Sequence, residues 1–74
     1  GGQFLGEFTP GGDNPTVDIP GYQLSPYVMA ALWKSTEGKE VFVLTNMDSK
    51  KHKVTLPDGR TTTVKPFSAK RIWK

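Results

Sequence analysis

The chain has 74 residues, enough for one small domain and too few for two hydrophobic cores. Apolar residues make up 35% and charged residues 23%, a composition typical of folded rather than disordered proteins. The sequence has no cysteine, which excludes disulfides and thiolate metal sites, and it has no run of about 18 apolar residues that could span a membrane.

The formal net charge of +3 is unevenly distributed along the chain. Residues 1–33 hold three acidic residues and no Lys or Arg, whereas residues 34–74 hold ten basic and four acidic residues, a net +6. We interpret the lysines as solubilising groups that keep strand edges from pairing. The alternative is a surface that binds nucleic acid.

Residues 1–26 are rich in proline and glycine and predict a wrapping segment with one or two short edge strands. Turn signals at residues 10–12, 13–15 and 20–21 divide it into short apolar groups. Residues 27–74 are expected to form the antiparallel core of the same single domain.

Two apolar runs open this core and predict a hairpin. Residues 27–34 and 40–46 read as strands, and Gly38 in the intervening turn suits a positive φ. Side chains alternate between the two faces of a strand, and both faces of this hairpin are apolar. Such strands are covered on both sides, so one face is expected to meet a second sheet or a partner outside this chain.

A second hairpin follows at residues 51–56 and 60–65. Residues 57–59 favour a three-residue loop that pairs Leu56 with Arg60 and places Gly59 in the left-handed position. That register puts four side chains on one face: Val54, Leu56, Thr62 and Val64. Residues 67–73 form the last predicted strand, with Phe67, Ala69, Arg71 and Trp73 on one face and Ile72 on the other.

These elements predict an all-β protein, a small antiparallel β-sandwich of six to eight short strands. A small closed β-barrel is the alternative. We predict no catalytic residue, metal site or cofactor, because the only histidine, His52, lies among lysines and is expected at a solvated or edge position.

Residues 27–74 resemble the C-terminal β-domain that follows the catalytic barrel in many bacterial glycoside hydrolases. The resemblance rests on an apolar strand that ends in Trp33-Lys34-Ser35, a strand that ends in Asn46, and a closing strand that begins with Pro66-Phe67-Ser68. It implies a non-catalytic accessory domain of a secreted or envelope enzyme, which packs on the catalytic barrel and stabilises it.

The partner that the resemblance implies is the parent catalytic domain, and a carbohydrate-binding module is the alternative function. The candidate contacts to either partner are aromatic: Tyr22, Tyr27, Trp33 and Phe42. A polysaccharide would gain hydrogen bonds from Asn46 or Asp48. Exposure of Trp33 on a flat face would favour glycan binding over packing.

A third interpretation, a small basic barrel that binds RNA or DNA weakly, rests on seven residues: Lys50, Lys51, Lys53, Arg60, Lys65, Lys70 and Arg71. Their predicted stripe lacks interleaved aromatic residues, which single-strand platforms use for stacking. Nucleic acid is therefore the least favoured partner.

Overall fold

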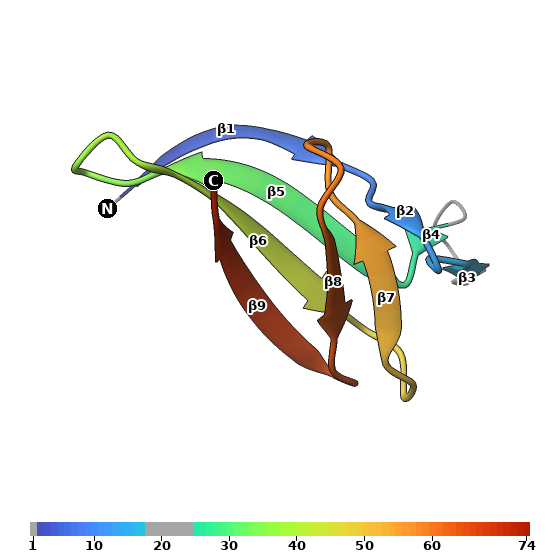
Figure 1. Ribbon diagram of the computed structural model, residues 1–74. Helices are drawn as coiled ribbons and strands as arrows, with labels where there is room; N and C mark the ends of the chain where they lie inside the picture. The colour runs from blue at the N-terminus through green and yellow to red at the C-terminus, as the bar shows by residue number, and fades with distance from the viewer. Residues whose placement is uncertain (1, 18–24) are drawn as a thin grey trace.

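The computed structural model describes residues 2–17 and 25–74, which form nine strands and no helix (Figure 1). Three of the strands have only two residues, so the predicted six to eight strands become six substantial strands and three short ones. The strands are β1 (Gln3–Phe8), β2 (Gly11–Gly12), β3 (Thr16–Val17), β4 (Ser25–Pro26), β5 (Val28–Lys34), β6 (Glu40–Asn46), β7 (His52–Thr55), β8 (Thr61–Val64) and β9 (Ser68–Trp73). In this part of the chain no helix is long and apolar enough to cross a membrane.

The strands pair into three antiparallel sheets. The largest has the order β1-β5-β6-β9, the second has the order β2-β7-β8, and β3 pairs with β4. Figure 1 shows β7 and β8 lying across one side of the four-stranded sheet. The small antiparallel β-sandwich predicted from the sequence is therefore confirmed.

The core lies between the two larger sheets and consists of side chains from one face of each sheet. Its fully or nearly buried apolar residues are Val28, Ala30, Phe42, Leu44, Val54, Leu56 and Val64. Phe8, Leu32 and Ile72 pack against this cluster, and the Phe8 and Phe42 rings meet edge to face at 5.5 Å. The core is thus filled by apolar residues that alternate along one face of each predicted hairpin.

Glycine sets both hairpin turns. Gly38 has a φ of 86° and Gly59 a φ of 92°, a backbone region that costs other residues about 1–2 kcal/mol. Leu56 N donates to Arg60 O at 2.8 Å, which closes the three-residue loop, and Lys53 pairs with Thr63. The predicted loop and register of the second hairpin are both confirmed.

The sandwich does not close into a barrel, because β8 and β9 belong to separate sheets. Side chains rather than a strand ladder bridge this gap: Arg60 Nη1 donates to Trp73 O at 3.1 Å, and Lys70 Nζ donates to Thr63 O at 3.2 Å. The barrel alternative was therefore wrong. The last strand also begins one residue later than predicted, since Phe67 has a φ of 49° and lies in the preceding turn.

Candidate functional site

The side of the four-stranded sheet that faces away from the core is the candidate site, and we call it the outer face. Strand register defines its members, because directly paired residues point to the same side. The paired positions of the outer face are Phe4, Glu7, Met29, Ala31, Trp33, Val41, Val43, Thr45, Ala69, Arg71 and Trp73.

One row of the outer face crosses all four strands and is aromatic. Phe4 pairs with Trp33, Trp33 with Val41, and Val41 with Trp73. The aromatic residues are 48%, 37% and 51% exposed in chain order, and the Phe4 and Trp33 rings meet edge to face at 5.2 Å. Val41 is only 7% exposed, because the two tryptophans flank it. The row is a continuous apolar ridge in contact with water.

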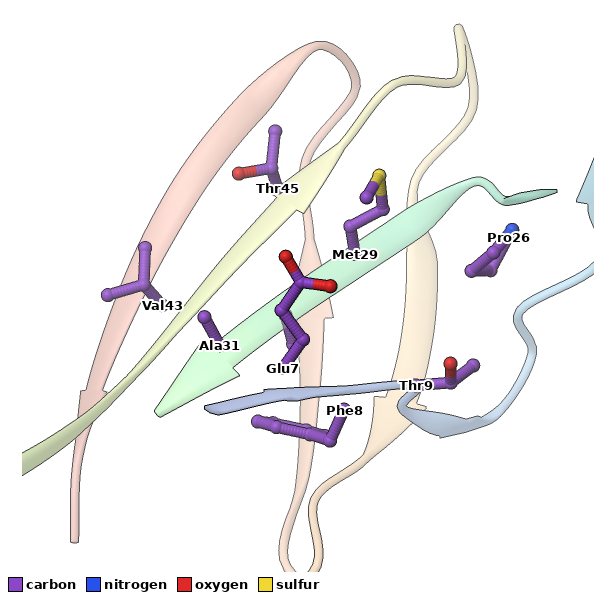
Figure 2. Close-up of a pocket in the computed structure, with 9 residues that line it drawn as sticks. Glu7, Phe8, Thr9, Pro26, Met29, Ala31, Val43 and Thr45 are labelled. Atoms are coloured by element: carbon purple, nitrogen blue, oxygen red, sulfur yellow. The ribbon is translucent and has the colours of Figure 1, made fainter. Parts of the chain in front are cut away.

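Beside this ridge the outer face is hollowed into an open depression of about 520 Å³. Figure 2 shows the side chains of Glu7, Met29, Ala31 and Thr45 projecting the same way from neighbouring strands, with the Glu7 carboxylate between Ala31 and Met29 in this view. Phe8 points to the other side of the sheet, toward the core. Small side chains at the centre of the sheet thus leave room for an incoming group.

Four aromatic residues were predicted as partner contacts, and those that the structure describes lie in different parts of the molecule. Trp33 lies on the outer face and is exposed. Phe42 is 2% exposed and belongs to the core, so it contacts neither a partner domain nor a sugar. Tyr22 lies outside the described residues. Phe4 and Trp73 are outer-face aromatics that were not proposed as contacts.

Tyr27 belongs to a different cluster, centred on His52. The two rings stack at 5.9 Å between centroids, with an interplanar angle of 11°. His52 is 5% exposed, and its Nδ1 and Nε2 lie 3.1 Å from Asp13 Oδ2 and 2.7 Å from Asp48 Oδ2. The expectation of a solvated histidine was therefore wrong. Both ring nitrogens face carboxylates, so neither is free to activate Ser49.

The hydrogen bond that His52 donates to the Asp48 carboxylate raises the pKa of His52 above its ordinary value of 6.5, although burial works in the opposite direction. The same hydrogen bond lowers the pKa of Asp48 below 3.8. A doubly protonated imidazolium between two carboxylates satisfies all of these contacts. The cluster therefore holds the Asp13 loop, the β6–β7 turn and β7 together.

The two polar residues proposed to bind a glycan are also used inside the fold. Asn46 is 1% exposed and makes three hydrogen bonds, with Lys50 O, Val64 O and Asp48 N. Asp48 accepts from Ser49 N and pairs with His52. Asn46 is therefore unavailable to a sugar, and that part of the glycan hypothesis was wrong, whereas the Asp48 side chain is 17% exposed.

Three lysines of the predicted basic stripe lie on or next to the second hairpin: Lys53 in β7, Lys51 just before it and Lys65 just after β8. Lys51, Lys53 and Lys65 are exposed, and the core residues Val54 and Val64 occupy the opposite side of these strands. The intervening positions on the exposed side are threonines rather than aromatics. In the described part of the chain, no group of three His, Cys, Asp or Glu side chains could hold a metal ion.

The whole chain is similar to part of a protein of Bacteroides thetaiotaomicron described as "Putative glycoside hydrolase". The two are 47% identical over 74 residues, which are 100% of this chain and 11% of the relative. No family model matches the chain, and no solved structure matches it. The comparison thus relates the chain to one small region of a much longer protein.

Proposed function

We propose that this chain is a non-catalytic, C-terminal accessory domain of a secreted glycoside hydrolase, which packs on the catalytic barrel through the outer face and stabilises it. The supporting relative is about nine times longer than this chain, since the match covers 11% of its length. The remainder of such a protein has ample length for a catalytic domain.

The observation that carries this proposal is the exposure of the outer face. Core packing uses only the inner side of the four-stranded sheet, yet Met29, Trp33 and Trp73 on the other side are between 37% and 51% exposed. Contiguous apolar surface of this kind marks interaction sites in soluble proteins. Tryptophan is one of the residue types most often found as a binding hot spot.

Replacing Trp33 by alanine is expected to separate packing from folding. In the isolated chain the side chain is 37% exposed but packs on Phe4 and shields Val41, so the free energy of unfolding should fall by about 1–2 kcal/mol. In the full-length parent, the loss of a hot spot should cost at least about 2 kcal/mol more than in the isolated chain and lower the melting temperature of this domain by about 8 °C or more beyond the shift seen there.

Calorimetry on both chains measures this difference. Phe67→Ala is the matched control, because Phe67 is 72% exposed and is not a member of the outer face. This control substitution should leave the melting temperature of the domain in the parent unchanged. The packing proposal would be refuted if the wild-type domain melted at the same temperature alone and in the parent.

Carbohydrate binding is the second candidate function. The exposure of Trp33 favours it, but the aromatic row borders a depression rather than lying on a flat face, and the buried Asn46 cannot contact a sugar, so packing ranks first. Phe4, Trp33 and Trp73 present exposed rings across one sheet face, and aromatic rings stack on the apolar faces of sugars. Binding on such an open surface should be weak, with a Kd of about 10⁻³–10⁻⁵ M.

Titration of the isolated chain with soluble polysaccharides, followed by tryptophan fluorescence, tests this function. Binding should shift the emission and should be lost in Trp33→Ala and Trp73→Ala, while Phe67→Ala retains it. Unchanged spectra across a broad polysaccharide panel would eliminate the carbohydrate hypothesis and leave the packing proposal standing.

A further inference from the structure

Two charges of opposite sign stand at opposite edges of the outer face. Of its eleven paired positions, only Glu7 on β1 and Arg71 on β9 are ionisable. They lie in one row, in which Glu7 pairs with Ala31, Ala31 with Val43, and Val43 with Arg71. Three strand spacings separate them, about 14 Å across the sheet.

Neither charge has an ionic or hydrogen-bonding side-chain partner among residues 2–17 and 25–74. Other charges in this part of the chain do pair, such as Asp58 with Arg60 and Glu40 with Lys74. Glu7 and Arg71 are both exposed and too far apart to pair with each other. Both charged groups are therefore hydrated.

A partner that covers the apolar ridge would displace this water. Glu7 lines the depression (Figure 2) and belongs to the row next to the ridge, and Arg71 occupies the other end of the same row. A carboxylate or guanidinium that loses water without gaining a counter-charge is strongly destabilising. A tight complex therefore requires complementary charges on the partner at both ends of the row.

We propose that the docked catalytic domain presents a basic group to Glu7 and an acidic group to Arg71, about 14 Å apart, and that this pair of contacts fixes its orientation on the sheet. The inference rests on the proposed packing function. The depression suits the basic group, because Ala31, Val43 and Met29 offer an apolar bed for the stem of an Arg or Lys whose charged end reaches Glu7. The reversed orientation would set like charges against each other.

Thiol labelling tests the inference, since this chain has no cysteine of its own. Ala69→Cys places a thiol on the exposed outer face, and Thr61→Cys places one on the exposed side of β8 as a control. The labelling rate of each is measured in the isolated chain and in the full-length parent, with the modified site identified by peptide mapping. Docking should slow labelling at position 69 at least tenfold in the parent and leave position 61 unaffected.

Charge reversal is then combined with Ala69→Cys in the parent. Glu7→Lys and Arg71→Glu should each raise the labelling rate at position 69 of the parent at least about fivefold. Glu37→Lys and Lys53→Glu make the same changes of charge at exposed positions away from the outer face, and they should leave the protection intact. The neutral variants Glu7→Gln and Arg71→Gln should raise the same labelling rate about threefold. They keep the test valid if a charge reversal disturbs the fold of the isolated chain.

The possible outcomes separate the two proposals. Protection at position 69 that survives every change at Glu7 and Arg71 would overturn the charge inference and leave the packing function intact. Equal labelling at position 69 in the isolated chain and in the wild-type parent would overturn the packing function itself.

Discussion

Replacement of Asn46 by alanine is expected to lower the free energy of unfolding by about 3 kcal/mol. The side chain is 1% exposed, and its Nδ2 donates to Lys50 O at 2.9 Å and Val64 O at 3.1 Å, while its Oδ1 accepts from Asp48 N at 2.9 Å. Alanine would leave three backbone groups unpaired, and each buried unpaired group costs about 1–3 kcal/mol. A chain of this length has only about 4–11 kcal/mol in total.

Urea denaturation of the wild type and of Asn46→Ala measures this loss directly. Asn14→Ala is a matched control, because Asn14 also makes three backbone hydrogen bonds, with Pro10 O, Val28 O and Val28 N. Asn14 is only half-buried, so water can replace part of what it provides, and the expected cost is about 1–2 kcal/mol. Equal losses in the two variants would contradict the structural role assigned to Asn46.

The stability of the chain is expected to fall as the pH rises past neutrality, because of His52. The Asp48 hydrogen bond raises the pKa of His52 in the folded state, so the folded chain holds this proton more tightly than the unfolded chain does. The contribution is complete below the unfolded pKa of about 6.5 and is lost as the pH rises through the folded pKa. Above that range a neutral ring has one N–H donor for two carboxylates.

Asp48 sets the lower pH limit of the range in which this cluster stabilises the fold. Its folded pKa is lowered, mainly by the His52 hydrogen bond, so its contribution is present above the ordinary value of 3.8 and disappears as the pH falls through the folded pKa. Asp13 and the Tyr27 ring are the other groups that contact His52. The cluster should therefore stabilise the fold most between about pH 4 and 6.5.

Urea midpoints of the wild type and His52→Gln between pH 5 and 9 test this dependence. The glutamine variant should lose about 2 kcal/mol at pH 6 and show a flatter profile above it, since it keeps size and one donor group but no titrating charge. A wild-type midpoint that stays constant from pH 6 to 9 would refute the role of the imidazolium.

The second hairpin shows how much the sequence could predict. Pro57, Asp58 and Gly59 each favour one position of a three-residue loop, and alternation on either side fixes the register. The same alternation places His52 on the side of Val54 and Leu56, which was the available signal for its burial. One of the two carboxylates that make burial tolerable, Asp48, lies only four residues away, but the other, Asp13, lies 39 residues away and had no local signal.

The candidate site was less predictable than the hairpins. Alternation shows that β5 and β6 have two apolar sides, but it does not tell which side receives the second sheet, and Phe42 was therefore misassigned. The aromatic row depends on the pairing of β1 with β5 and of β9 with β6. A register shift between Phe4 and Gly6 also changes which residues of β1 face outward, and such bulges have no reliable local signature.

The strand order β1-β5-β6-β9 has a consequence for the order of folding. The β5–β6 and β7–β8 hairpins join neighbouring strands and can form within about 1–10 μs. β1 and β9 pair with partners distant in sequence, so they should join late, after the loop-closure entropy of those pairings has been overcome. Because Phe4 and Trp73 belong to these two strands, the aromatic row is complete only in the native state, and a half-folded chain lacks the surface proposed to recognise its partner.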